Sequence, residues 1–245
     1  MKKILSPSIM CADFGRLREE IALLDAAGAD MFHIDIMDGE FVPNFAMSWS
    51  DVNAIRTATQ KPLAVHLMVN NPVIHLPHAF KNKVDTIYVH FEIGNSENYL
   101  NEIKNNNIET GLAINPNTEL TEFQSLLPLV DRLLVMRVQP GFAGSSAVPE
   151  VEQKLHQLTR IKGRKFTISL DGAVSPEVIA RWNKKGVKEF VIGTASEAFG
   201  EKRGGRSYFE IMKILRDGMR NTSQTDTTQK EEILGFPSHE VRKAG

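Results

Sequence analysis

The sequence is poor in cysteine, in net charge and in long apolar runs. Its single cysteine, Cys11, has no partner for an internal disulfide; this is typical of a reducing compartment, so we expect a cytoplasmic protein. The formal net charge is −1, so the chain lacks the basic excess of nucleic-acid-binding proteins and polybasic membrane anchors. The apolar run near the N-terminus is too short for a signal peptide or a membrane span. We therefore expect neither a nucleic-acid nor a membrane partner.

What the chain does have is a regular alternation of strand-like and helix-like segments. Short apolar runs bounded by turn residues predict eight strands, at 4–8, 31–36, 62–68, 85–90, 110–114, 132–136, 166–170 and 189–192. Apolar residues at helical spacing predict helices at 14–27, 50–57, 96–104, 119–127, 149–158, 176–185 and 208–217. Asp13 can cap the first helix and Gly28 can end it, whereas Pro77 should leave any helix at 72–81 short or broken.

This alternation predicts an α/β fold with a parallel sheet, because strands that alternate with helices pair through right-handed crossovers. Eight such units close more naturally into a (β/α)8, or TIM, barrel than into an open doubly wound sheet, although spacing alone leaves the second arrangement open. The length of 245 residues is close to the roughly 250 of a one-domain barrel. We predict a single barrel over residues 1–220 and a polar, disordered tail at 221–245, within which only 233–239 is apolar enough to dock.

Acids, histidines and methionines stand at the ends of four predicted strands, which is where barrel enzymes place their active sites. Strand side chains alternate, so the motif HIDIMDG at 33–39 should direct its isoleucines toward the helices and its other side chains into the barrel. The same reasoning places His66 and Met68 of the next predicted strand inward. It also places Met136 of the sixth strand and Asp171 at the end of the seventh inward. The inward set is His33, Asp35, Met37, His66, Met68, Met136 and Asp171.

The two histidines and two aspartates of this set could bind one divalent metal ion. Each taken alone is more often a turn residue, a helix cap or a satisfied polar group. Together, on inward positions of three strands, they need partners, and a shared metal ion supplies one. A nitrogen and oxygen ligand set suits zinc, iron, manganese or cobalt better than magnesium or calcium. Methionine fills gaps in protein cores, so the three methionines are core residues by default.

Glycine-rich loops after the last three strands predict a phosphate site. Because the chain has no overall positive field, a small anion must be held by local features. Small residues let backbone N–H groups approach an anion, and loops after strands seven and eight commonly bind phosphate in this fold. The loops contain Gly141, Phe142, Ala143 and Gly144 after strand six, Gly172 and Ala173 after strand seven, and Gly193 and Thr194 after strand eight.

These segments closely resemble the ribulose-phosphate 3-epimerase family, whose relatives include allulose-6-phosphate 3-epimerases. The resemblance runs in collinear order from residue 4 to about residue 199. Its motifs are Ser6-Pro7-Ser8-Ile9, Ala12-Asp13-Phe14, HIDIMDG with Phe41-Val42-Pro43-Asn44, His66-Leu67-Met68-Val69, Asn115-Pro116, Pro140-Gly141-Phe142 with Gly144, Asp171-Gly172, and Gly193-Thr194.

The resemblance implies a TIM barrel of the ribulose-phosphate-binding type and an isomerase. It implies that His33, Asp35, His66 and Asp171 bind the metal, and that Asp35 and Asp171 are also the acid/base pair. Ser8 and His66 would contact the substrate, and the three methionines would line the site. The expected reaction interconverts D-ribulose 5-phosphate and D-xylulose 5-phosphate, as in the pentose phosphate pathway, and the alternative substrate is D-allulose 6-phosphate. The expected partner is thus a small phosphorylated ketose, and we expect a homo-oligomer.

Several residues depart from the family pattern without touching the metal set. Ser145 replaces the usual Gln, Gln139 the usual Asn or Asp, and Arg137 a small residue, while the strand-seven turn reads DGA in place of DGG. Met10-Cys11 and Gly193-Thr194 are more like the allulose-phosphate enzymes, whereas Ala12-Asp13-Phe14 is like the pentose enzymes. We hypothesise that Arg137, Gln139 and Ser145 tune the choice of sugar; the alternative is neutral drift.

Two other functions fit this barrel less well. Decarboxylases that act on orotidylate or ketogulonate phosphate depend on an Asp-x-Lys-x-x-Asp array, and here no lysine stands between Asp35 and Asp38. A non-catalytic phosphosugar-binding protein would be expected to lack a carboxylate or a metal ligand, and all four candidates are present.

Overall fold

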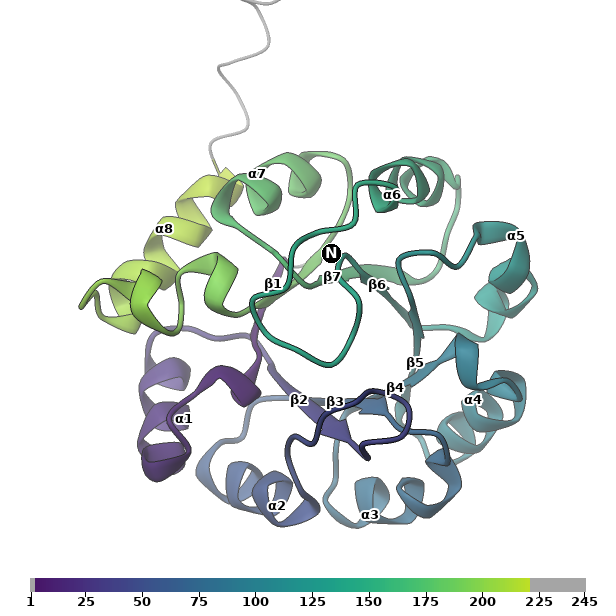
Figure 1. Ribbon diagram of the computed structural model, residues 1–245, viewed down its shortest axis with the longest axis horizontal. Coiled ribbons are helices and arrows are strands. Elements are labelled where there is room, and N and C mark those ends of the chain that lie inside the picture. The colour runs from purple at the N-terminus through teal and green to yellow at the C-terminus, as the bar shows by residue number, and fades with distance from the viewer. Residues whose placement is uncertain (1–2, 221–245) are drawn as a thin grey trace, which may run out of the picture.

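Eight parallel strands form the centre of the molecule in the computed structural model, which describes residues 3–220 (Figure 1). Each strand from β2 to β7 hydrogen-bonds to the strand that follows it along the chain, and β8 pairs with β1. A parallel bridge between Ser8 and His33 links β1 to β2, so the sheet is a nearly closed barrel. The strands are β1 (Ile4–Pro7), β2 (Phe32–Met37), β3 (Leu63–Met68), β4 (Thr86–His90), β5 (Glu109–Ile114), β6 (Arg132–Met136), β7 (Thr167–Asp171) and β8 (Glu189–Ile192).

The predicted (β/α)8 fold and all eight predicted strands are confirmed, and no strand end differs from its prediction by more than one residue. The predicted tail at 221–245 lies outside the described residues. Among residues 3–220, no helix combines the length and apolar character needed to cross a membrane.

Eight α-helices of the described chain form the outer ring in Figure 1. They are α1 (Leu17–Ala26), α2 (Trp49–Ala58), α3 (Leu76–Lys81), α4 (Ser96–Asn105), α5 (Leu120–Phe123), α6 (Val151–Arg160), α7 (Pro176–Lys184) and α8 (Tyr208–Arg220). As predicted, segment 72–81 is broken, into a 3-10 turn (Pro72–Ile74) and the short helix α3.

Two predicted helices need correction. The segment at 14–27 begins with a separate 3-10 turn (Phe14–Arg16), and Asp13 caps that turn by accepting from the Gly15 N–H. The helix predicted at 119–127 is the single turn α5 followed by a 3-10 segment (Gln124–Leu129). Pro128 lies inside the 3-10 segment, and a proline ring clashes with the carbonyl four residues earlier in an α-helix. The α-helical geometry therefore ends early.

Strand alternation separates two apolar layers. Phe32, Ile34 and Ile36 of β2 belong to the large core between the sheet and the helices. A smaller cluster inside the barrel includes Ala64, Tyr88 and residues of the opposite wall, and Met37 and Met68 pack together above it. The inward direction predicted for the polar residues of β2 and β3 follows from this pattern.

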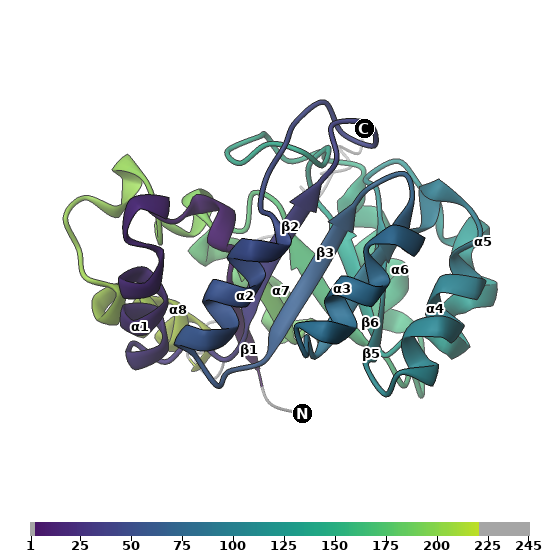
Figure 2. The same ribbon diagram turned by 90° about the horizontal axis from the view of Figure 1, so that it is seen from below.

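The carboxyl ends of the strands share one end of the barrel, the upper end in Figure 2. The segments after β2 and β6 rise above this end, and the β6–α6 segment crosses the mouth of the barrel in Figure 1. The mouth is the part of a barrel where catalytic groups gather.

Candidate functional site

A compact cluster of four possible metal ligands lies just inside the mouth. Strand register places Asp35 beside His66, and β7 brings Asp171 to them. His33 Nε2 lies 3.3 Å from Asp35 Oδ1 and 3.6 Å from Asp171 Oδ2. His66 Nδ1 lies 3.2 Å and 3.7 Å from the same two oxygens, and 3.4 Å from His33 Nε2. One donor atom from each residue thus falls within 4.8 Å of all the others.

These separations fit a metal ion bound by all four residues. Around a tetrahedral centre with bonds of about 2.1 Å, ligand atoms are about 3.4 Å apart, and the five separations above lie close to that value. Both imidazoles have no exposed surface, and Asp35 is 2% exposed. Buried carboxylates require a compensating positive charge. The cluster could therefore hold a divalent metal ion.

The electrostatics of the cluster show the same need for positive charge. Burial by itself would lower the pKa of His33, but the charges of Asp35 and Asp171 raise it to about 9. Burial by itself would raise the pKa of Asp35, but His33 and the hydrogen bond from His66 hold it well below its usual range. Burial and the neighbouring Asp35 charge raise the pKa of Asp171. The two carboxylates thus favour a positive charge at the point where the four side chains meet.

A hydrogen-bonded chain that the sequence analysis missed supports His66 from behind. The far ring nitrogen, His66 Nε2, lies 2.8 Å from His90 Nε2, and the two rings are stacked. His90 Nδ1 lies 3.0 Å from Glu92 Oε2, and Glu92 accepts from the Asn115 N–H at 2.7 Å. Such partners fix the tautomer and orientation of a ligating imidazole. The signal was available, because His90 ends a predicted strand and faces the same way as Tyr88.

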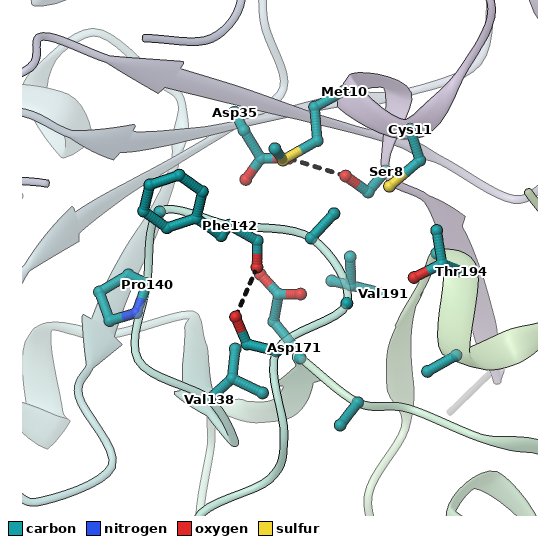
Figure 3. A pocket seen from close by; sticks show the side chains of 18 of the residues that line it. Ser8, Met10, Cys11, Asp35, Val138, Pro140, Phe142, Asp171, Val191 and Thr194 are labelled. Atoms are coloured by element: carbon teal, nitrogen blue, oxygen red, sulfur yellow. Dashed lines mark hydrogen bonds between the residues drawn. The ribbon is translucent and has the colours of Figure 1, made fainter. Parts of the chain in front are cut away.

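A pocket opens above the cluster, between the strand ends and the β6–α6 segment. Figure 3 shows Asp35 and Ser8 on one side of it and Asp171 on the other. Ser8 Oγ donates to Asp35 Oδ2 at 2.8 Å. The structure places every predicted substrate-contacting residue except His66 on the pocket wall, and His66 lies beneath it. Those on the wall are Ser8, Met37, Met68, Met136, Gly141, Phe142, Ala143, Gly144, Gly172, Ala173, Gly193 and Thr194.

Backbone geometry shapes the side of the pocket formed by β7 and β8. Gly172 and Ala173 both have a positive φ, 86° and 48°. A Cβ on Gly172 would come within 2.5 Å of the Val138 side chain, so glycine is required there for space as well as for conformation. Gly144 lies beside Thr194, because a Cβ added to this glycine would be 4.0 Å from Thr194 Oγ1, the distance of an ordinary contact. The loops after β6 and β8 therefore meet across the pocket.

The three residues that depart from the family pattern occupy different places. Ser145 lines the pocket and donates to the Phe142 carbonyl at 3.1 Å, whereas Arg137 and Gln139 are not on its wall. The pocket also has lining residues that sequence reasoning did not select: Met10, Cys11, Val138, Pro140, Val174, Val191 and Ala195. Most are small or apolar residues without a chemical signature, so only their position in the fold reveals them.

Fold and site together define a (β/α)8 barrel with two histidines and two aspartates clustered below a pocket at the mouth. The model of the ribulose-phosphate 3 epimerase family matches residues 4–196. This protein belongs to that family. The chain is 38% identical over 198 residues to the ribulose-phosphate 3-epimerase of Synechocystis sp., covering 78% of this chain and 86% of the relative. It is 34% identical over 223 residues to the chloroplastic ribulose-5-phosphate-3-epimerase of Arabidopsis thaliana, covering 89% of this chain and 77% of the relative.

Solved structures support the fold. The crystal structure of 3-keto-L-gulonate-6-phosphate decarboxylase from Vibrio cholerae superimposes with a TM-score of 0.69 at 15% identity, covering 90% of this chain and 98% of that one. The tryptophan synthase alpha chain of Legionella pneumophila gives a TM-score of 0.62 at 16% identity, covering 91% of this chain and 94% of that one. At such low identity the likeness extends to the fold alone.

Proposed function

We propose that this protein is a metal-dependent 3-epimerase that interconverts D-ribulose 5-phosphate and D-xylulose 5-phosphate. The observation that carries the proposal is the placement of two carboxylates, Asp35 on β2 and Asp171 on β7, at the floor of one pocket beside two buried imidazoles. Inverting a carbon requires a base on one face and an acid on the other. Carboxylates from strands on different walls of the barrel suit those two roles.

In the proposed reaction, one aspartate removes the proton from carbon 3 and the other returns a proton from the opposite face. Ser8 orients Asp35 by donating to Oδ2, which leaves Oδ1 toward the histidines. His33, Asp35, His66 and Asp171 would hold a zinc, iron, manganese or cobalt ion. When bound, the metal supplies positive charge that stabilises the negative charge developing on the sugar oxygens. Met37, Met68 and Met136 exclude water beside the reacting carbons.

The phosphate would bind to backbone N–H groups at the far side of the pocket, at Gly172–Ala173 and Gly193–Thr194, with help from Gly144. Small residues let the backbone approach the anion, and Gly144 and Thr194 face each other there. Binding energy from the phosphate would then position carbon 3 between the aspartates.

The test is an assay in D2O with ribulose 5-phosphate. Each product molecule should carry deuterium at carbon 3, because the removed proton stays on a different aspartate from the one that donates, and nuclear magnetic resonance detects the label. Product that keeps its original hydrogen indicates a single-base or hydride route and rules out the two-aspartate assignment. Running allulose 6-phosphate in parallel decides between five- and six-carbon substrates.

The homo-oligomer and the cytoplasmic location remain predictions. Exposed Phe45, Val73 and Ile74 offer apolar surface that a second copy of the chain could cover. Light scattering of the purified protein measures the number of copies.

A further inference from the structure

Arg137 is a buried cation that stands behind the pocket wall. It follows β6 and is 6% exposed. Its Nη1 donates to the Gly172 carbonyl at 3.4 Å and to the Ala173 carbonyl, and its backbone N–H donates to the Asp171 carbonyl at 2.7 Å. One residue thus binds three successive carbonyls at the end of β7. A buried guanidinium requires such partners, and its side chain finds two of them here, the carbonyls of Gly172 and Ala173.

Holding these carbonyls fixes the direction of the N–H groups beside them. In a trans peptide the C=O and N–H point in opposite directions, and the described chain has no cis peptide. Carbonyls drawn toward Arg137 therefore turn the N–H groups of Gly172, Ala173 and Val174 away from it. All three of these residues line the pocket and Arg137 does not, so N–H groups directed away from Arg137 are directed to the pocket side of the wall.

Two of these N–H groups have no acceptor within the described residues. The Gly172 N–H interacts with the Asp171 carboxylate. The N–H groups of Ala173 and Val174 donate to no protein atom of residues 3–220. Donors that line a pocket and lack protein partners are suited to bind a ligand.

The backbone here also needs external support. Gly172 and Ala173 are both left-handed, which alanine adopts only with strain. The Ser196 hydroxyl donates to the Val174 carbonyl and holds the next peptide from the β8 side. Without a partner for the 172 and 173 carbonyls, the alanine would relax toward a common conformation and its N–H would turn out of the pocket.

We propose that Arg137 is a positioning residue for the substrate phosphate. By binding the carbonyls of Gly172 and Ala173, its side chain directs the N–H groups of Ala173 and Val174 toward the anion. This changes one donor of the proposed phosphate site, because the Gly172 N–H interacts with the Asp171 carboxylate and Val174 takes its place. The inference rests on the proposed function, which places the phosphate of the ketose at this wall. It replaces the sequence-based hypothesis that Arg137 tunes the sugar, since Arg137 is not on the pocket wall.

Arg181 provides a matched control. Glu152 binds both arginines, Arg137 Nη2 at 3.3 Å and Arg181 Nη2 at 2.7 Å. Arg181 lies on α7, its side chain is 49% exposed, and none of its hydrogen bonds reaches residues 171–174. Arg181→Met removes one cation from Glu152 and changes nothing at the wall. Arg137→Met also removes the side-chain contacts to the Gly172 and Ala173 carbonyls, and it keeps the backbone contact to Asp171.

The experiment measures binding of inorganic phosphate by calorimetry, together with kcat and KM for ribulose 5-phosphate and metal content. Arg137→Met should weaken phosphate binding and raise KM by on the order of tenfold, the effect of losing one charge-assisted hydrogen-bond group. Metal content should not change, and kcat should fall by a smaller factor than KM rises. Arg181→Met should stay within about twofold of the unaltered protein in every quantity, as expected for an exposed ion pair.

Equal phosphate affinity in Arg137→Met and the unaltered protein overturns the proposal, as does an equal loss in Arg181→Met. If Arg137→Met does not fold, Arg137→Lys decides, because an ammonium keeps the charge but cannot span the carbonyls and Glu152 together. Its phosphate affinity should fall by a few-fold, and an unchanged value contradicts the role. Phosphate binding that depends on Arg137 in a protein that does not epimerise ribulose 5-phosphate would retain this inference and refute the proposed function.

Discussion

The two halves of the candidate site are built from different parts of the polypeptide. The metal half consists of side chains that point inward from β2, β3 and β7, and its histidines are completely buried. The half proposed to bind phosphate, called the phosphate half here, is lined mostly by small residues of the segments after β6, β7 and β8. A strand fixes the direction of its side chains by alternation, whereas a loop N–H points wherever torsions and neighbouring groups direct it. The metal half is thus set by local sequence and the phosphate half by tertiary contacts.

The largest expected effect comes from the metal half. Asp35→Asn should lower kcat by roughly 10⁴-fold, since it removes a proton-transfer group while keeping the shape of the side chain. Turnover of ribulose 5-phosphate and metal content should be measured in the same sample, because Asp35 is also a candidate ligand.

Asp38→Asn is the control, because Asp38 lies three residues further on and accepts from loop N–H groups outside the cluster. It should keep its metal ion and most of its activity. An Asp35→Asn protein that holds a full complement of metal and retains a tenth of the activity would exclude Asp35 as an acid/base group.

The phosphate half should be nearly as important for substrate use. Ribulose without its phosphate should lose kcat/KM by roughly a thousandfold, because each of two charge-assisted hydrogen bonds contributes about 1.5–3 kcal/mol. Initial rates for the two substrates measure the ratio. Equal turnover of ribulose and ribulose 5-phosphate would mean that the backbone wall has no part in binding.

Metal retention tests the metal half without involving the phosphate half. His66→Ala removes one of four candidate ligands and should lose metal on dialysis against a chelator under conditions in which the unaltered protein keeps it. Elemental analysis gives the metal content. His78→Ala, which removes an exposed histidine stacked on Trp49, should retain the metal. Full metal content in His66→Ala would show that His66 is not a metal ligand.

A smaller effect is expected from the groups behind His66. His90→Phe keeps a ring against Phe41 but removes the contact to His66 Nε2, so metal affinity should fall by roughly 10–100-fold. Competition with a chromogenic chelator measures this affinity. Glu92→Gln should have a weaker effect in the same direction. If both variants bind metal as tightly as the unaltered protein, the chain His66–His90–Glu92 only fills space.

The difference between the halves also explains what the sequence could predict. His33, Asp35, His66 and Asp171 were identified because inward and outward positions alternate and their residue types are chemically distinctive. The left-handed Ala173 was not foreseen, since alanine carries no signal for a positive φ. The carbonyl contacts of Arg137 join β6 to the end of β7, 36 residues away in the chain. No local pattern encodes such a contact. The helix at 119–127 was predicted too long for a different, local reason, because the effect of Pro128 on the residues before it was not considered.

The smallest expected effect concerns the choice of sugar, and here the structure separates residues that the sequence grouped together. Ser145 lines the pocket and Gln139 does not, so only Ser145→Gln should alter the ratio of kcat/KM between five- and six-carbon substrates. The change should not exceed about tenfold, because Ser145 is half-buried and a side-chain extension in a partly open pocket discriminates weakly. Gln139→Asn serves as the matched control in the same segment, and rates with ribulose 5-phosphate and allulose 6-phosphate give the ratio.

Equal ratios in both variants and the unaltered protein would favour neutral drift at position 145. A shift with Gln139→Asn alone would instead show that the β6–α6 segment acts on the sugar through its backbone. The choice of sugar would then depend on tertiary contacts, as the phosphate half does.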